Sequence, residues 1–542
     1  MSIFSIGVSG LQTAQTVLAT TSNNISNVYT PGYNRQLAQV GERFAGSGVE
    51  VVNIERQFNQ FVANQLNRSN GVAGALSSYH AQVSQIDTLL ADREAGLAPL
   101  MSKFFSALED VVASPADPAA RQGVLGAAQT LTGQFRAFEG YLSDMQSSIN
   151  GQLKDQVTQI NNTAGQVANL NREIALAKAK TGEAPNGLLN MRDQLVAELS
   201  QRIDARLTVQ DGGSYNLTLG NGLSLVSGTN SFKLEAMRSS EDASRFVVGY
   251  RDPGGNLVEF PDTTFQDGEL GGLMTFRRES LDRTQGQLGQ LAVSLAVAFN
   301  QQHAQGVDLY GDAGGDFFTI GAPVSFSNTG NRGDAVLSAS YDPAALASLT
   351  ASDYNVSWSA ADGYSVVRRD IGAAVEANYD SANGTLSFGG MTVQVSGTPA
   401  EGDRFLIQPT RAAAARLGNN LTDPARIAAG QPEGGSGSGD NRNALQLQAL
   451  QTRSLVGGQA TLSQGYAAIV SDIGNRTSIA AANLSAQQGL SEQLSALQQA
   501  DSGVNLDEEA ANLIRYQQFY QANAKVIEIG ATVLDTLLGI RA

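Results

Sequence analysis

The residues that could support catalysis are few in this sequence. The chain has no cysteine and only two histidines, His80 and His303. The lack of cysteine excludes thiolate nucleophiles, disulfides and thiolate zinc sites. A Ser–His–Asp triad would have to use one of the two histidines, and no Gly-x-Ser-x-Gly segment is present to expose a nucleophilic serine. We therefore interpret both histidines as surface or boundary residues of helices.

Patterns for phosphate and metal binding are also missing. The sequence contains neither a Walker A segment nor a Gly-x-Gly-x-x-Gly fingerprint, and the Gly/Ser stretch 434–439 lacks the lysine of a phosphate loop, so we interpret it as a linker. Asp308, Asp312 and Asp316 have the wrong spacing for an EF-hand, and the glutamate that would end such a loop is absent. We interpret them as solvated turn residues, with a weak cation site as the alternative.

The remaining charged residues suggest structure rather than catalysis. Glu508 and Glu509 are adjacent, so they do not share a helix face, and we interpret them as first-turn acids that favour the helix dipole. Arginines scattered along predicted helices, such as Arg121 and Arg136, are interpreted as solvated. The sequence therefore predicts a protein that is not an enzyme and that has no cofactor and no metal.

Composition limits the partners. The 542-residue chain has a net charge of −16 and only 6% aromatic residues. A strongly acidic chain is unsuited to nucleic acids and to anionic membranes, which attract basic surfaces. No apolar run is long enough to span a bilayer, and the N-terminus lacks the basic region of a cleaved signal peptide. We expect a cytoplasmic protein, or one exported by a route that leaves the sequence intact.

The element that organises the chain is its last helix, predicted over 505–538. Asn505 is placed to cap it, with Glu508 reaching back, and Gly539 is placed to end it. Mostly apolar positions recur along it with alternating spacings of four and three, which is the pattern of a coiled-coil seam. These positions are Leu506, Ala510, Leu513, Gln517, Tyr520, Ala524, Ile527, Ala531, Leu534 and Leu538.

A matching seam lies at the other end, in a helix predicted from Ser2 to about Ser22. The Asn/Ser-rich segment 22–27 is expected to weaken that helix, and residues 30–33 form a type II turn. The seam positions are Phe4, Val8, Leu11, Gln15, Leu18, Ser22 and Ile25, and no charged residue precedes Arg35. The two seams could pair with each other, with neighbouring copies, or both. The alternative is that each helix docks on the protein's own core.

Between the ends, helical and β patterns alternate. After a break predicted at 114–118, an apolar periodicity that begins at Val124 and could continue to Lys180 predicts a helix of roughly 60 residues, about 90 Å long. We expect an α+β multidomain fold, an elongated α-helical bundle with coiled-coil terminal helices and antiparallel β insertions. The expected domains are paired terminal helices (1–34 plus 505–542), a helical rod domain (35–310 plus 411–504) containing a small β region at about 206–265, and an inserted outer β-domain (316–410).

Both ends resemble one known family. Residues 11–36 and 502–518 are similar to the N- and C-terminal signatures of the flagellar rod, hook and hook-associated proteins. The residues that carry the resemblance are Asn24, Asn27, Thr30, Pro31, Gly32, Tyr33, Glu508, Glu509, Asn512, Tyr516 and Gln517. The chain length and interior segments such as 268–273, 291–303 and 311–318 favour a member located at the hook–filament junction.

The resemblance implies a structural role in the bacterial flagellum. It implies export without cleavage through the flagellar type III system, and an extracellular location in which copies of the chain form a helical ring. The implied partners are hook protein below, a second junction protein and filament above, and a cytoplasmic export chaperone on the C-terminal helix. The ring is expected to template filament assembly. No nucleic acid or membrane partner is implied.

Two other functions remain open at this stage. One is another axial flagellar protein of the hook type, and the other is an exported coiled-coil adhesin or translocator. For the inner contact we predict Phe4, Leu11 and Leu18 on one side, and on the other the residues Leu513, Tyr520, Ile527 and Leu534. The wider set of predicted assembly residues adds Val8, Ile25, Leu506 and Leu538.

Overall fold

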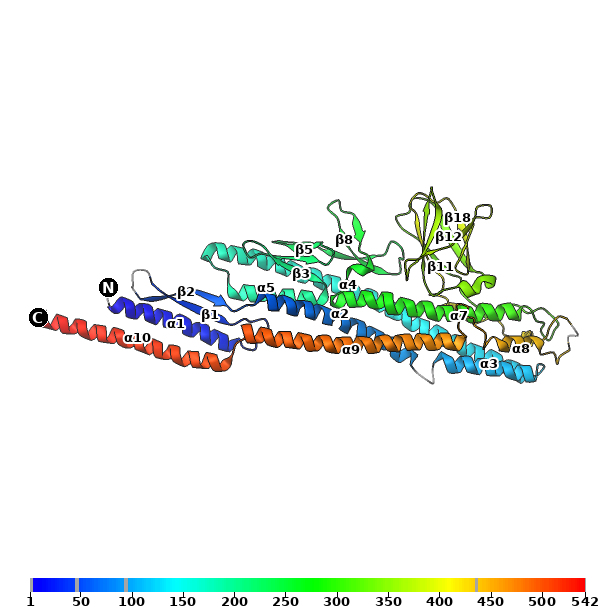
Figure 1. Ribbon diagram of the computed structural model, residues 1–542, viewed down its shortest axis with the longest axis horizontal. Coiled ribbons are helices and arrows are strands. Elements are labelled where there is room, and N and C mark those ends of the chain that lie inside the picture. The colour runs from blue at the N-terminus through cyan, green and yellow to red at the C-terminus, as the bar shows by residue number, and fades with distance from the viewer. Residues whose placement is uncertain (1–2, 44–47, 92–95, 434–436, 542) are drawn as a thin grey trace.

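A computed structural model of the chain describes residues 3–43, 48–91, 96–433 and 437–541. Its helices run along one long axis, and two β regions stand on the same side of them (Figure 1). The predicted α+β fold class, with a long helical bundle and antiparallel β insertions, is confirmed. The Gly/Ser linker predicted at 434–439 falls partly outside the described residues.

The two terminal helices lie side by side at one end of the molecule (Figure 1). They are α1 (Ile3–Ser26) and α10 (Leu506–Arg541), and the antiparallel hairpin of β1 (Gln36–Glu42) and β2 (Val49–Arg56) packs on α1. The expectation that the Asn/Ser segment ends α1 near Ser22 was wrong. Ser26 Oγ donates to the carbonyl of Ser22 at 2.9 Å, so this polar side chain returns to its own helix, which continues to Ser26. Likewise α10 continues through Gly539.

In the described part of the rod, eight α-helices run along the long axis. They are α2 (Gln60–Leu90), α3 (Leu97–Ala113), α4 (Pro118–Thr181), α5 (Asn186–Arg202), α6 (Gly268–Phe276), α7 (Asp282–His303), α8 (Arg442–Ala449) and α9 (Leu462–Ser502). The predicted long helix is confirmed as α4, which has 64 residues, begins at Pro118 after an Asp117 cap and ends at Gly182 with φ 85°. Between the Gly/Ser stretch and the terminal helix, the chain forms the two helices α8 and α9.

The small β region contains two antiparallel sheets that cover α4. The first joins β3 (Ala205–Val209), β4 (Tyr215–Leu219), β5 (Ser224–Ser227) and β6 (Asn230–Ser231), and the second joins β7 (Leu234–Arg238), β8 (Phe246–Arg251) and β9 (Leu257–Glu259). Alternate residues of β4 are buried, as expected for a sheet with one face on a core. Leu153, Val157 and Ile160 of α4 complete that core with Leu217 and Val226.

The outer β region is built from two further antiparallel sheets. One has the order β11-β19-β13-β14-β15 and the other the order β12-β18-β17-β16. The strands are β11 (Val324–Ser327), β12 (Val336–Tyr341), β13 (Tyr354–Ser359), β14 (Gly363–Arg368), β15 (Ala374–Val375), β16 (Asn378–Asp380), β17 (Thr385–Phe388), β18 (Met391–Ser396) and β19 (Arg404–Gln408). Its buried side chains form one continuous core with those of the rod helices, so hydrophobic packing already links the two.

Three residues that we interpreted as surface, boundary or solvated residues are buried: His303 at the end of α7, Arg121, and Asp308, which is 8% exposed. His303 has no exposed surface: its Nδ1 lies 2.7 Å from the carbonyl oxygen of Gly315, and its Nε2 accepts the backbone N–H of Ala428 at 2.9 Å. Arg121 is 2% exposed and donates to the carbonyls of Pro115 and Ile427. His303 and Arg121 close the rod end that is farthest from the termini, where loops would otherwise leave buried carbonyl and amide groups unpaired.

Candidate assembly interface

Glycines lie on both helices where α1 packs against α10. A Cβ atom at Gly7 would lie 2.6 Å from Cγ1 of Ile527, and one at Gly10 would overlap the Asn523 side chain. On α10, a Cβ atom at Gly530 would lie 2.8 Å from Cγ2 of Ile3 in α1. The absence of a side chain at these positions lets the two helices approach more closely than bulky seam residues would allow.

The buried face of α1 is therefore turned relative to the predicted seam. Its buried positions include Gly7, Gly10, Ala14, Val17, Thr21 and Asn24. Each of these six residues precedes a seam position by one residue, which is a rotation of about 100° around the helix. Heptad counting follows bulky apolar residues, whereas the helices pack through the small ones. The bulky seam residues of α1 are half-buried or exposed, and Phe4 packs beside Gly530 of α10.

The predicted assembly residues divide into two groups. Those that are half-buried in the single chain are Phe4, Leu11, Leu18, Ile25, Leu513, Tyr520 and Ile527. Those that are exposed are Val8, Leu506, Leu534 and Leu538. The structure therefore brings Leu513, Tyr520 and Ile527 to the side of α10 that faces α1, and leaves Leu534 beyond it. Whether either group contacts a neighbouring copy stays a prediction.

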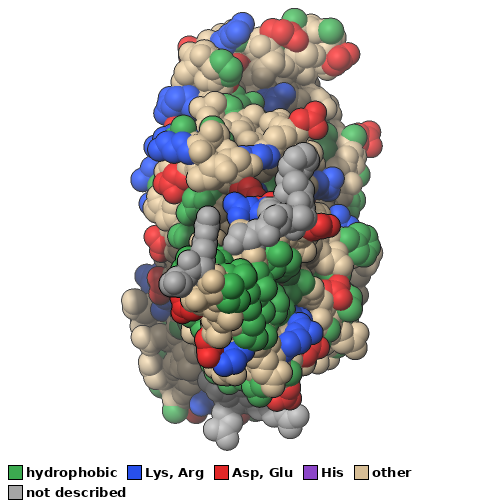
Figure 2. Space-filling model, turned by 90° about the vertical axis from the view of Figure 1, so that its left-hand side faces the viewer, with side chains coloured by type: hydrophobic (Ala, Val, Ile, Leu, Met, Phe, Trp, Pro, Cys, Tyr) green, Lys and Arg blue, Asp and Glu red, His purple; other side chains and the backbone are tan. Residues whose placement is uncertain are grey.

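The free end of α10 carries an uncovered apolar surface. Ile3, the first described residue of α1, lies beside Gly530, and residues 531–540 extend past it with every side chain exposed. The large apolar members of this end are Val533, Leu534, Leu537, Leu538 and Ile540. Figure 2 looks onto this end of the molecule and shows a hydrophobic patch there. We call these five residues the α10 tip. A soluble monomer seldom exposes such a contiguous patch unless it binds something.

A compact polar network joins the terminal helices to the rod, at a bend that we call the elbow. The carboxylate of Glu509, 1% exposed, accepts from Nε of Arg35 at 2.8 Å and from Nδ2 of Asn24 at 3.2 Å. A second guanidinium nitrogen of Arg35 contacts the exposed Glu508 at 2.8 Å. The backbone N–H of Arg35 donates to the carbonyl of Ser502 at the end of α9. The elbow thus ties α1, α10 and α9 together.

Tyr33 closes the network. Its hydroxyl donates to Oδ1 of Asn24 at 2.8 Å, and the same oxygen accepts the backbone N–H of Gln36 at 3.0 Å. Burial, with the nearby charge of Glu509 as a second cause, raises the pKa of Tyr33 to about 12. The phenol therefore stays protonated and remains a donor at neutral pH.

The predicted type II turn over 30–33 is confirmed. The N–H of Tyr33 donates to the carbonyl of Thr30 at 3.2 Å, and Gly32 has φ 74°, which L side chains rarely adopt. Pro31 and Gly32 themselves are exposed. Next to the turn, Asn34 is buried and donates to Asn190 of α5 at 2.8 Å. The turn therefore positions the residues that follow it, which make the contacts.

The other signature residues surround the elbow. Asn27 donates to the carbonyl of Asn23 and accepts from the hydroxyl of Thr30, which fastens the end of α1. On α10, Asn512 and Tyr516 are half-buried, whereas Gln517 is exposed. Asn505 caps α10 as predicted, because its Oδ1 accepts the N–H of Asp507 at 3.0 Å. The predicted return contact of Glu508 is replaced by its ion pair with Arg35.

An open groove of about 1060 Å³ borders the elbow, between the 28–35 loop, α2, α5 and the end of α9. Asn and Gln side chains such as Asn67, Asn70, Gln201 and Gln498 line it. Beside this groove, the loop meets α5 through polar contacts such as that of Asn34 with Asn190.

Sequence reasoning missed Arg35 as the centre of the elbow. It noted Arg35 only as the first charged residue, and it assigned Glu508 and Glu509 to the helix dipole. The partners are separated by more than 470 positions. The available signal was the combination of one lone cation after an uncharged N-terminal end with two acids at the start of the C-terminal helix.

Clusters of metal-ligating side chains and membrane-spanning helices are not found among the described residues. No group of three or more His, Cys, Asp or Glu side chains among them is placed to hold a metal ion. Oδ1 of Asp308 accepts the N–H groups of Tyr310 and Asp312, as in a closed turn. Among all the residues that the structure describes, no helix is both long and apolar enough to cross a bilayer.

Comparison with known proteins identifies the family. Residues 83–318 match the family described as the flagellar hook-associated protein FlgK helical domain, and residues 326–409 match the D2-like domain of flagellar hook-associated protein 1. The chain is 40% identical over 550 residues to flagellar hook-associated protein 1 of Escherichia coli, and the match covers 100% of both chains. The chain belongs to the flagellar hook-associated protein 1 family. The corresponding Salmonella typhimurium protein is also 40% identical, over 554 residues and 100% of both chains.

Further matches support membership of the hook-associated protein 1 family. Residues 4–34 match the flagella basal body rod protein family, and residues 498–540 match the C-terminal part of the basal body rod FlgEFG proteins. The solved flagellar hook junction protein FlgK from Burkholderia pseudomallei superposes with a TM-score of 0.74 at 29% identity, covering 80% of this chain and 99% of that one. The terminal resemblance noted in the sequence is thereby confirmed.

Proposed function

We propose that the chain is a structural component of the bacterial flagellum that forms the junction between hook and filament and templates filament assembly. The observation that carries this proposal is the full-length similarity to hook-associated protein 1 at 40% identity. Paired terminal helices with an uncovered apolar tip support the same role. We propose a purely structural function, without catalysis, cofactor or metal.

The proposed partners are those that the family resemblance implies. Copies of the chain arrange in a helical ring, in which the α10 tip and the flanking seam residues pack on neighbouring terminal helices. Hook protein lies below this ring, and a second junction protein and then filament lie above it. Before assembly, a cytoplasmic export chaperone covers α10, and the uncleaved chain leaves through the flagellar type III system to an extracellular position.

We also propose a division of labour along the chain. The terminal helices (1–34 plus 505–542) form the inner tube, the helical rod domain (35–310 plus 411–504) surrounds it, and the outer β-domain (316–410) faces the exterior. Support comes from the separation of these parts along and beside the long axis (Figure 1). The elbow would then set the angle between the inner tube and the rod domain.

The experiment that tests this function is a clean deletion of the gene, followed by electron microscopy of the cells and an assay for flagellin in the medium. The proposal predicts hooks without filaments and flagellin released as monomer, with restoration by the intact gene. Missing hooks would place the protein lower on the axis. Normal flagella would contradict the proposal.

A further inference from the structure

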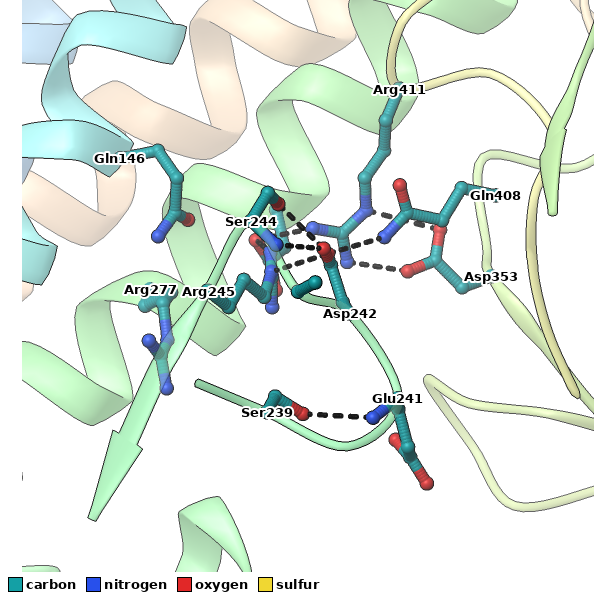
Figure 3. A network of polar contacts seen from close by, with 12 residues as sticks. Gln146, Ser239, Glu241, Asp242, Ser244, Arg245, Arg277, Asp353, Gln408 and Arg411 are labelled. Carbon is teal, nitrogen blue, oxygen red and sulfur yellow. Dashed lines mark hydrogen bonds and ion pairs between the residues drawn. The ribbon is translucent and has the colours of Figure 1, made fainter. Parts of the chain in front are cut away.

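A cluster of charged side chains is enclosed where the outer β-domain meets the rod domain (Figure 3). Asp242 and Arg245 come from the loop between β7 and β8, and Asp282 is the first residue of α7. Asp353 directly precedes β13, and Arg411 follows β19. The side chain of Asp353 is 3% exposed, and those of Asp282 and Arg411 are 12% and 13% exposed. Three separate units of the fold therefore contribute to one largely buried cluster.

Arg411 bridges two of these units. Its Nη1 lies 2.5 Å from Oδ1 of Asp282 in the rod domain, and its Nη2 lies 2.6 Å from Oδ2 of Asp353 in the outer β-domain. A third nitrogen, Nε, donates to Oδ1 of Asp353 at 3.0 Å. Arg245 also pairs with Asp282 through two of its nitrogens and contacts Asp242 at 3.3 Å. Two guanidinium groups thus form ion pairs with three carboxylates.

Asp282 and Asp353 differ in how strongly their surroundings stabilise the charged carboxylate. Arg245 and Arg411 lower the pKa of Asp282 despite its burial, because both cations contact it. Burial raises the pKa of Asp353, and the neighbouring charge of Asp282 opposes the lowering effect of Arg411. The nearby Arg277 is occupied by Asp262 at 3.0 Å and by the carbonyl of Phe246. Asp353 therefore depends on Arg411 for its charge.

We propose that Arg411 is a latch that fixes the orientation of the outer β-domain, because it neutralises Asp353 of that domain and Asp282 of the rod domain at once. Without Arg411, Asp353 would lie buried near the charge of Asp282 with no cation of its own, because Arg245 pairs with Asp282. An uncompensated buried charge is strongly unfavourable. The domains would separate until water reached the carboxylates. With Arg411 in place, no uncompensated carboxylate opposes the hydrophobic packing that joins the outer β-domain to the rod domain.

The inference deepens the proposed junction function, on which its biological meaning rests. A ring of identical subunits requires every copy to present its outer β-domain at the same angle. The test below uses the purified chain and no flagella. A negative result would therefore remove the latch without touching the proposed function, and a negative deletion experiment would leave the latch intact.

The variants are chosen by their effect on the net charge of the buried cluster. Arg411→Met removes the latch, and Asp353→Asn removes the carboxylate that depends on it. The double variant, with both changes, carries the same net charge in the cluster as the natural chain. Arg369→Met is the matched control, because Arg369 also links the outer β-domain to the β7–β8 loop, through Glu241 at 3.0 Å, but is 38% exposed. Exposed ion pairs contribute little.

The measurement is the distance distribution between two spin labels, attached to cysteines at Ser147 of α4 and Ser381 of the outer β-domain. The chain has no natural cysteine, so labelling is specific. We expect one narrow distribution for the natural chain, Asp353→Asn and Arg369→Met, a broad one for Arg411→Met, and a return to the narrow one in the double variant. A narrow distribution in Arg411→Met would overturn the proposal. If Arg411→Met fails to fold, the double variant must fold, and its failure would equally overturn the proposal.

Discussion

Removing Arg35 is the sharpest perturbation of the elbow. The Arg35→Met variant keeps the apolar stem of the side chain and deletes the guanidinium that contacts both Glu508 and Glu509. Glu509 would then remain buried, with its side chain 2% exposed and the Asn24 amide at 3.2 Å as its remaining side-chain donor. Breaking a buried ion pair by deleting one partner costs about 3–5 kcal/mol, because the other charge stays buried without compensation.

The adjacent acid supplies the matched control. Glu508 contacts the same guanidinium at 2.8 Å, but its side chain is 58% exposed. An exposed pair contributes only about 0–1 kcal/mol, so Glu508→Gln should hardly change the elbow. Arg35→Lys should be intermediate, since an ammonium group keeps the charge but lacks the planar fork that reaches two carboxylates.

Amide hydrogen exchange of the purified chain, read on peptides that cover 27–36 and 502–512, measures the opening of the elbow. A loss of about 3 kcal/mol corresponds to more than a hundredfold faster exchange through local opening, against less than about tenfold for Glu508→Gln. Swarming of the complemented deletion strain should fall in the same order. Equal exchange rates in Arg35→Met and Glu508→Gln would refute the buried-pair argument.

Three further predictions concern the terminal helices. Gly10→Ala should prevent α1 from packing on α10, because a Cβ atom there would overlap the Asn523 side chain. The control Gly140→Ala, on the open face of α4, should be neutral or stabilising. Swarming and thermal unfolding would test both variants. Leu513→Asp should leave a soluble, folded rod domain but abolish filaments, whereas Gln518→Asp on the exposed face should not; normal filaments with Leu513→Asp would contradict the role of this face. Tyr33 has a pKa raised from 10.0 to about 12, so its contribution to elbow stability is complete below pH 10 and is lost as the pH rises through 12. The difference in elbow exchange between the natural chain and Tyr33→Phe should therefore shrink across that interval, and a constant difference would contradict the assignment.

Local patterns predicted the elements whose residues specify them nearby. The periodicity from Val124 onward and the break at Pro118 were sufficient for α4. Pro31 and Gly32 were sufficient for the turn, because positive φ at the third position demands glycine. The period change after Arg206 located the small β region for the same reason, since strand and helix periods differ. Each of these signals lies within a short window of sequence.

What could not be predicted depends on partners far away in the chain. The face of α1 is set by glycines that matter only because Asn523 and Ile527 approach them. Arg121 looked solvated on its own helix, but its acceptors include the carbonyl of Ile427, about 300 positions away. Arg35 and Arg411 likewise have their roles because carboxylates that are distant in sequence lie next to them in the folded chain. The local sequence pattern around a residue therefore does not reveal such distant partners.

The central claim, that the chain sits between hook and filament, can be tested by locating it on intact flagella. The sequence has no cysteine, so a single Ser381→Cys variant in the outer β-domain can be labelled specifically with maleimide-linked gold on living, motile cells. The account predicts label at one place on each flagellum, where the curved hook meets the filament. Label along the hook or the filament, or on the cell surface away from flagella, would contradict it.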